Sequence, residues 1–129
     1  MHRSVLTAAT WAMALSIPFG SHVSAKNGDA ALGGQIFSER CAMCHSIKKG
    51  HGTIVGPNLF GVVGRPIGKL PGFRFSHALA SANGTWNTQA LNAFLKDPAV
   101  ARPGTVMPFT GIKSSAQRAA LIRFLKAHR

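Results

Sequence analysis

Apolar residues recur at helical spacing near both ends of this chain. One stretch follows Asp29, whose carboxylate can cap a helix N-terminus, and continues to about Arg40. The other covers residues 115–127, where an apolar face lies between Arg and Lys side chains. Gly33 interrupts the first stretch, and because a helical glycine costs about 1 kcal/mol against alanine, it predicts close approach of the C-terminal helix. The apolar positions are Leu32, Ile36 and Phe37 in the first helix, and Leu121, Ile122, Phe124 and Leu125 in the last.

A third helix is predicted in the second half of the chain. Asn87 or Thr88 can cap it, and Leu91, Phe94 and Leu95 form its apolar face. It must end near Asp97–Pro98, because proline disfavours helical geometry in the residue before it. Residues 45–83 are rich in glycine and proline and predict successive turns without a regular sheet. The pattern therefore indicates a single all-α domain with long loops.

The first 25 residues have the features of a secretory signal peptide. His2 and Arg3 supply a positive start, residues 5–17 an apolar run, and residues 23–25 a small-residue cleavage site. The run is shorter than the roughly 20 residues that a membrane span needs, although an uncleaved anchor remains an alternative. We therefore expect removal of residues 1–25, export to the periplasm, no stable membrane insertion, and a domain of residues 26–129.

Residues 41–45, Cys-Ala-Met-Cys-His, place two thiols and an imidazole within one turn. This spacing is typical of haem c attachment, in which each thiol adds to a haem vinyl group and the histidine binds the iron. We predict one haem c, covalently attached through Cys41 and Cys44, with His45 as an iron ligand. A covalent haem would also supply much of the core that so short a domain needs.

Three other interpretations of the two cysteines remain as alternatives: a zinc site, a redox-active disulfide and a structural disulfide. A zinc site would need further ligands from among His51, His77 and His128, which show no recognisable ligand spacing. A redox-active disulfide normally accompanies a βαβ pattern, which the chain lacks, and a purely structural disulfide is a third interpretation.

Met107 is the leading candidate for the second iron ligand. Met1 and Met13 lie in the predicted leader, and Met43 lies between the two cysteines, where it cannot reach the opposite haem face. The segment Pro-Gly-Thr-Val-Met-Pro around Met107 forms neither helix nor strand readily and can hold one side chain in place. The three histidines above, or a vacant iron site, remain as alternatives.

Taken together, these motifs resemble those of class I c-type cytochromes, in particular mitochondrial cytochrome c and its periplasmic bacterial relatives. The resemblance covers nearly all of residues 26–129, including the Cys-Ala-Met-Cys-His motif, Gly-Pro-Asn-Leu-Phe-Gly at 56–61 and Pro-Gly-Thr-Val-Met-Pro-Phe at 103–109. It implies the small cytochrome c fold, in which the N- and C-terminal helices cross and loops and short helices wrap around one covalent haem.

The resemblance also implies roles for residues around the haem. The carbonyl of Pro57 would accept a hydrogen bond from the second ring nitrogen of His45 and so fix its tautomer. Arg65 and Trp86 match positions that hold a haem propionate, and Leu59 and Phe109 match residues that line the haem. The complete predicted cofactor-binding set is Cys41, Cys44, His45, Pro57, Leu59, Arg65, Trp86, Thr105, Met107 and Phe109, with His45 and Met107 as the metal ligands.

Three aromatic positions depart from the family pattern, because the chain contains no tyrosine. Phe75, Phe94 and Phe124 stand where the family often has hydroxyl-bearing rings. Phe75 cannot donate a hydrogen bond to a propionate, and Phe94 cannot donate one to the sulfur of Met107. We expect a haem pocket that is less polar than is usual in the family.

The charge of the chain constrains its partners. The formal net charge is +12, and removal of the leader with Arg3 leaves 14 Lys and Arg against 3 Asp and Glu, or +11. The basic residues are scattered apart from Lys48–Lys49 and form no nucleic-acid motif, so we expect protein partners and no nucleic acid. Arg40 and Lys113 match the basic ring of the family. Apolar or small residues replace lysines that are frequent in that ring, at Ile54, Ala99 and Val106.

The function predicted from the sequence is that of a monomeric, periplasmic, monohaem electron carrier without enzymatic activity. Its partners would be redox proteins with acidic or mixed acidic and apolar docking faces. Two alternatives remain: a tightly bound haem subunit of a larger dehydrogenase or oxidase, and a haem sensor or enzyme that binds a small ligand at the iron.

Overall fold

The computed structural model describes residues 25–129, and this part of the chain contains three helices longer than a single turn. They are α1 (Ala25–Arg40), α3 (Thr88–Lys96) and α5 (Ser115–Ala127). The bounds of α3 and α5 confirm the sequence prediction at both ends. The predicted leader falls almost wholly on residues 1–24, which lie outside the described part.

Two single-turn helices and long loops complete the described chain. α2 (His77–Ala80) and α4 (Pro98–Ala101) were not individually predicted. Residues 45–76 contain turns and bends, and the β pairing in the described residues is limited to an isolated bridge between Pro66 and Thr85. The prediction of an all-α domain with irregular loops is therefore confirmed.

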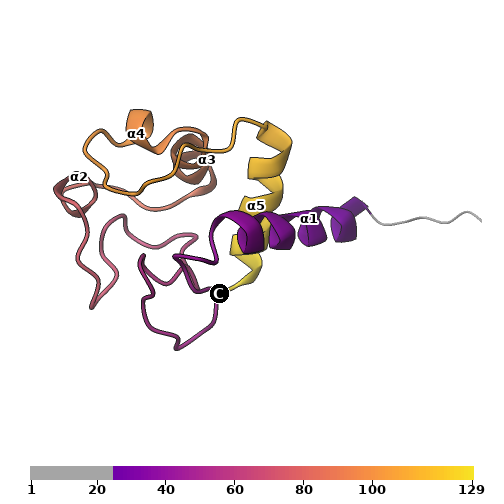
Figure 1. The fold of residues 1–129 in the computed structure, drawn as a ribbon, viewed down its shortest axis with the longest axis horizontal. Coiled ribbons are helices and arrows are strands. Elements are labelled where there is room, and N and C mark those ends of the chain that lie inside the picture. Colours follow the sequence, from indigo (N-terminus) through magenta and orange to yellow (C-terminus); the bar gives the residue numbers. More distant parts are fainter. Residues whose placement is uncertain (1–24) are drawn as a thin grey trace, which may run out of the picture.

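Helices α1 and α5 cross and pack against each other (Figure 1). The crossing point is Gly33, because a Cβ atom built there would collide with the backbone oxygen of Ala120 and lie 2.7 Å from Cβ of Phe124. Phe37 extends the contact, with its ring centroid 5.4 Å from that of Phe124. Ala120 and Leu121 of α5 are completely buried. The predicted role of Gly33 in close helix approach is confirmed.

The expectation that Asp29 caps the first helix is wrong. α1 begins at Ala25, so Asp29 lies inside the helix. Its carboxylate instead forms an ion pair of 2.8 Å with Arg123 on α5. An acidic residue near a helix N-terminus is favoured both as a cap and within the first turns, and here an oppositely charged partner on the crossing helix is within reach.

Side-chain caps define the starts of α3 and α5. The side-chain oxygen of Asn87 accepts a hydrogen bond from the backbone nitrogen of Ala90 at 2.8 Å. The hydroxyl of Ser114 accepts one from the nitrogen of Gln117 at 3.3 Å. Such caps satisfy backbone donors that have no partner inside the helix, which explains why both helices begin where they do.

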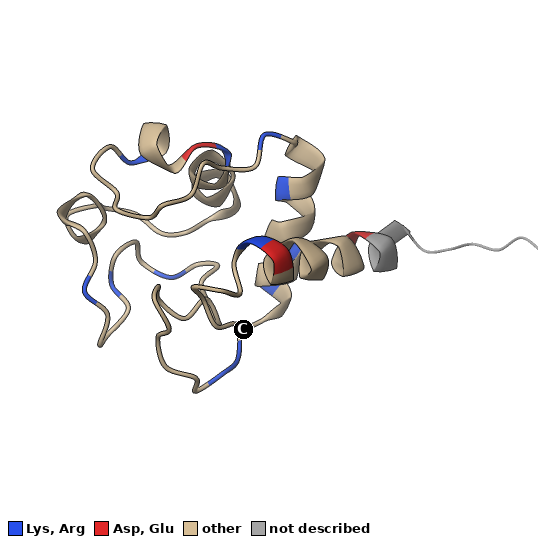
Figure 2. Cartoon of the chain, in the orientation of Figure 1, with Lys and Arg blue, Asp and Glu red and all other residues tan. Residues whose placement is uncertain are grey.

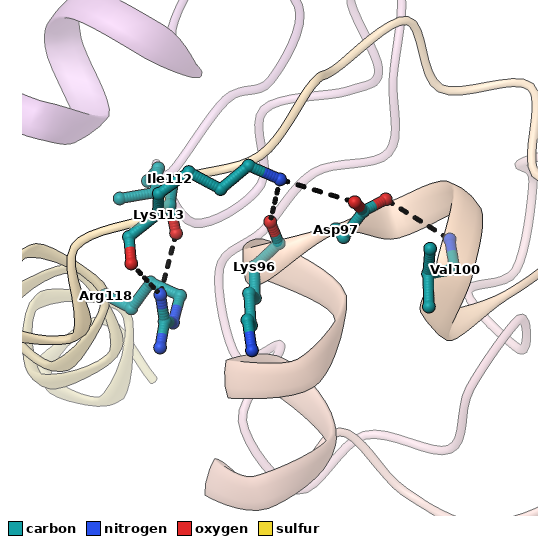
Figure 3. Close-up of polar contacts among 6 residues, drawn as sticks. All are labelled: Lys96, Asp97, Val100, Ile112, Lys113 and Arg118. Atoms are coloured by element: carbon teal, nitrogen blue, oxygen red, sulfur yellow. Dashed lines mark hydrogen bonds and ion pairs between the residues drawn. The ribbon is translucent and has the colours of Figure 1, made fainter.

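A cluster of polar contacts closes the base of the loop that carries Met107 (Figure 3). Arg118 is buried, and its guanidinium donates to the carbonyl oxygens of Ile112 and Lys113 at 2.8 Å each. The ammonium of Lys113 lies 3.3 Å from the carboxylate of Asp97, and Asp97 also accepts from the nitrogen of Val100 at 3.2 Å to cap α4. The loop is thus tied to α3, α4 and α5 at its ends.

Replacement of Asp97 by asparagine is expected to destabilise the protein more at neutral pH than in acid. The hydrogen bond from the Val100 nitrogen, followed by that from Lys113, lowers the pKa of Asp97 below its ordinary value of 3.8. A lowered folded-state pKa contributes stability above pH 3.8 that is lost as the pH falls through the folded value. Asparagine keeps the cap but loses the charge.

Urea unfolding at pH 7 and at pH 3 measures this difference. E39Q is the control, because it removes another carboxylate, which accepts a hydrogen bond of 2.9 Å from the side chain of Gln35. A D97N defect of equal size at both pH values would contradict the expectation.

None of the helices in the described residues is both long enough and apolar enough to cross a membrane.

Candidate haem site

The loops between α1 and α5 enclose a cavity of about 300 Å³. All ten residues predicted from the sequence to bind the cofactor line it: Cys41, Cys44, His45, Pro57, Leu59, Arg65, Trp86, Thr105, Met107 and Phe109. They come from the turn that follows α1 and from loop segments at residues 57–65, at Trp86 and at residues 105–109. Residues more than sixty positions apart in the sequence are therefore brought to one cavity.

The imidazole of His45 is held in a single orientation. Its Nδ1 lies 2.7 Å from the carbonyl oxygen of Pro57, and because a carbonyl only accepts hydrogen bonds, Nδ1 carries the proton. Burial lowers the pKa of His45, opposed in part by this hydrogen bond. The ring is therefore neutral, with the lone pair of Nε2 available to a metal.

Gly56 makes this orientation possible. A Cβ atom at residue 56 would collide with Cε1 of His45 and lie 2.7 Å from its Nδ1. The backbone nitrogen of Gly56 also donates to the carbonyl of Cys44 at 2.7 Å, so the loop is joined directly to the cysteine motif. The glycine before Pro57 is thus required for the histidine to fit.

The two cysteines are not joined to each other. Burial raises the pKa of the Cys41 thiol to about 11, with the charge of Arg40 acting in the opposite direction and Cys44 adding to the rise. Thiol–disulfide exchange proceeds through a thiolate, and the raised pKa disfavours that form at Cys41. In the described residues no three His, Cys, Asp or Glu side chains come together, whereas a structural zinc site uses four ligands.

Arg65 lies at the wall of the cavity and is held by backbone carbonyls. Its guanidinium donates to the oxygens of Asn58, at 2.9 Å, and of Phe60. Burial lowers its pKa. Asn58 is itself buried and donates to the carbonyls of Lys48 and His51, so it organises the loop that presents Arg65. The Trp86 nitrogen donates to the carbonyl of Arg65 at 2.8 Å, and both residues line the cavity. Their binding of a haem propionate stays a prediction.

Two buried hydroxyls in the cavity lining have no hydrogen-bond partner in the described structure, namely Oγ of Ser76 and Oγ1 of Thr105. A buried hydroxyl without a partner is costly, and a carboxylate of a bound group would satisfy both. A haem brings two propionates, so the donor set fits the cofactor. Ser76 was missed in the sequence, because an isolated serine in a loop gives no sign of its tertiary surroundings.

Met107 lies in the cavity lining on a loop shaped by Pro103 and Gly104. Gly104 has φ +89, and the nitrogen of Thr105 donates to the carbonyl of Arg102 at 3.0 Å, which is the geometry of a proline–glycine turn. The histidines considered as alternatives are elsewhere. None of them lines the cavity: His51 and His77 are exposed, and His128 donates to the carbonyl of Phe124.

A helical shell of this kind, with two cysteines, an oriented histidine and a thioether around one apolar cavity, defines a c-type haem protein. The family model described as Cytochrome c matches residues 30–129. Similar proteins include the cytochromes c of Stellaria longipes (41% identical, covering 78% of this chain and 94% of the relative) and Euglena viridis (41%, covering 77% and 96%). That of Chlamydomonas reinhardtii is 43% identical, covering 77% of this chain and 88% of the relative.

The chain belongs to the cytochrome c family. It carries one haem c with its iron, covalently attached through Cys41 and Cys44, and it is a monohaem, electron-carrying cytochrome.

Phe94 is an apolar residue of the cavity lining, which also includes Met107. It is buried and packs against Trp86 with ring centroids 5.0 Å apart. We expect F94Y to raise the reduction potential, because a hydroxyl donor to the sulfur makes it a weaker donor to ferric iron. A net hydrogen bond of about 1 kcal/mol corresponds to roughly 40 mV.

Redox titration of the purified holoprotein measures this shift. F124Y is the matched control, since Phe124 packs between the terminal helices and does not line the cavity. An unchanged or lowered potential in F94Y would defeat the expectation.

Proposed function

We propose that this cytochrome shuttles single electrons between redox proteins, with His45 and Met107 bound to the iron in both oxidation states. The observation that supports this most strongly is the convergence of His45, oriented by Pro57, and Met107 on one cavity. His45 and Met107 would together hold the iron and leave no position on it for a substrate, which would favour electron transfer over ligand binding or catalysis.

The residues around the haem would set its reduction potential and shield it from water during electron transfer. When bound, the haem supplies the one-electron Fe(II)/Fe(III) chemistry. The hydrogen bond from His45 to Pro57 makes the imidazole a stronger donor and prevents its rotation. The apolar walls, including Leu91, Phe94 and Leu95, exclude water and favour the reduced state, which carries one less positive charge.

Four apolar residues, called the apolar rim below, are 58 to 84% exposed: Met43, Ile54, Val55 and Val106. Val55 and Val106 also line the cavity. Met43 belongs to the haem-attachment motif, and the Val55 nitrogen donates to the carbonyl of Cys44 at 3.2 Å, so this part of the rim lies beside the motif. Solvent-exposed apolar groups at a redox opening favour a contact surface for another protein.

Charge is distributed differently from these apolar residues. Lys and Arg are spread over all sides of the described chain, whereas Asp and Glu are few (Figure 2). Of the two basic positions predicted for the docking ring, Lys113 is neutralised in part by its ion pair with Asp97, which leaves Arg40. We propose that the occupant of the rim is a redox protein with an apolar centre and an acidic margin, so that charge steers encounter and apolar contact sets residence time.

Electron-transfer kinetics of V106K with the native partner test this docking proposal. A116K adds the same charge on the exposed start of α5 and serves as the control. The proposal expects V106K to shorten the lifetime of the complex while A116K changes only the salt-dependent association rate. Equal effects of the two variants, or a salt dependence matching the full +11 charge, would contradict it.

We also propose that the protein works in the periplasm as a free monomer. Support comes from the leader-like pattern of residues 1–25. Fractionation of cells that express the full chain tests the location, and gel filtration of native extract tests the free state. Recovery of the haem protein from the cytoplasm, or in a large complex, would overturn the respective part of the proposal.

Absorption spectroscopy combined with redox titration tests the proposed function itself. We expect a ferric methionine–iron band near the red end of the spectrum, a reversible one-electron Nernst curve, and negligible binding of carbon monoxide. Absence of the band together with ready carbon monoxide binding would instead identify a ligand-binding haem sensor or enzyme.

A further inference from the structure

The cavity is lined by three arginines and by no acidic side chain. The arginines are Arg40, Arg65 and Arg74. The chain contains only three acidic residues, and all are engaged elsewhere: Asp29 with Arg123, Asp97 with Lys113, and Glu39 with Gln35. No carboxylate of the protein therefore neutralises the cations of the cavity, and the two propionates of the haem are the anions available to do so.

The known donors are unevenly shared between two propionates. Arg65 is a charged donor that also serves the carbonyls of Asn58 and Phe60. The two unpartnered hydroxyls, of Ser76 and Thr105, are neutral donors. With the indole of Trp86 as a further neutral donor, one propionate can thus pair with Arg65, whereas the other would be held by neutral donors alone. A cation in addition to them would bind it more strongly, because charge-assisted hydrogen bonds are roughly twice as strong as neutral ones.

Arg74 lies on the segment that supplies Ser76, and this segment is braced. Pro71 and Gly72, with φ +79, form a turn in which the nitrogen of Phe73 donates to the carbonyl of Leu70 at 3.4 Å. The rings of Phe73 and Phe75 then pack edge to face with centroids 4.7 Å apart. Arg74, which lies between these two residues in the sequence, is exposed, lines the cavity and has no ion-pair or hydrogen-bond partner in the described residues.

We propose that Arg74 binds a haem propionate at the solvent edge of the cavity, next to Ser76. This arginine supplies the donor that Phe75, which lacks a hydroxyl, cannot supply. A cation held at this edge disfavours the ferric state, which is the more positively charged of the two, and so raises the reduction potential. The inference depends on the haem itself and is independent of which proteins exchange electrons with it.

The reduction potential of the R74Q holoprotein tests the proposal. K126Q is the control, because Lys126 is an exposed cation near the end of α5 that does not line the cavity. We expect R74Q to lower the potential more than K126Q. At 1 M salt, where the screening length is about 3 Å, the K126Q shift should vanish while part of the R74Q shift persists.

Two further measurements separate contact from a general disturbance of the turn. The propionate bending modes in the resonance Raman spectrum should shift in R74Q and not in K126Q. R74K, which keeps the charge, should restore the potential. Equal shifts in R74Q and K126Q at every salt concentration, unchanged propionate modes, or failure of R74K to restore the potential would each overturn the proposal, while leaving electron carriage unaffected.

Discussion

G33A will lower the stability of the holoprotein by about 2 to 3 kcal/mol, since overpacking a tight interior contact costs 1 to 3 kcal/mol or more. The added methyl would meet the backbone oxygen of Ala120 and lie 2.7 Å from Cβ of Phe124. Neither atom is the movable end of a side chain, so α1 and α5 must separate. For a domain of this size the melting temperature should fall by roughly 10 °C or more, as thermal unfolding followed by circular dichroism will measure.

The adjacent glycine provides a matched control. A methyl at Gly34 would approach only the ring of Phe124, at 3.3 Å from its Cε2, and a ring can turn aside. Because alanine is favoured over glycine in a helix by about 1 kcal/mol, G34A should be neutral or slightly stabilising. Equal melting temperatures for G33A and G34A would show that the crossing does not depend on residue 33.

M107A will abolish the ferric band near the red end of the spectrum and lower the reduction potential by on the order of 0.2 V, within the roughly 0.8 V that axial ligands span. The thioether favours ferrous iron, and water or another hard ligand in its place favours ferric iron. The loop should remain in place, since Arg118 and the Asp97–Lys113 pair hold its base. Absorption spectroscopy and redox titration of the purified holoprotein measure both effects.

M43A is the corresponding control for the methionine. Met43 lies within the attachment motif but is 84% exposed, so its removal should leave the spectrum and the potential unchanged. Retention of the red band in M107A would show that the sulfur bound to the iron is not that of Met107.

Much of this fold could be predicted because its helices carry their own boundary signals. α3 and α5 begin directly after Asn87 and Ser114, whose side chains supply hydrogen-bond acceptors, and α3 ends before Pro98. The prediction for Asp29 was wrong because a carboxylate near a helix start can either cap that helix or form an ion pair with a residue of a neighbouring helix. Here the position of Arg123 on α5 decides between the two. The single-turn helices α2 and α4 are too short to show any periodicity.

The site was predictable to a similar degree and for a similar reason. Closely spaced groups such as Cys41, Cys44 and His45 reveal their chemistry in one turn of chain. Ser76 and Arg74 do not, because a hydroxyl or guanidinium in a loop becomes a cavity group only through the turn that places it. The ion pair of Lys113 with Asp97, sixteen positions away, could not be predicted from the sequence either. This ion pair reduces the positive charge that Lys113 can offer to a partner.

The crossing of α1 and α5 joins the first and the last helices of the described chain, which has a consequence for biosynthesis. The face of α1 around Gly33 has no partner until the final thirteen-residue helix has been synthesised. Leu125 of α5 also lines the cavity that contains Cys41 and Cys44, so a chain that lacks α5 cannot complete the wall of this cavity. Packing of α5 against α1 is therefore the final step in forming the domain. A chain truncated before α5 should be degraded by proteases.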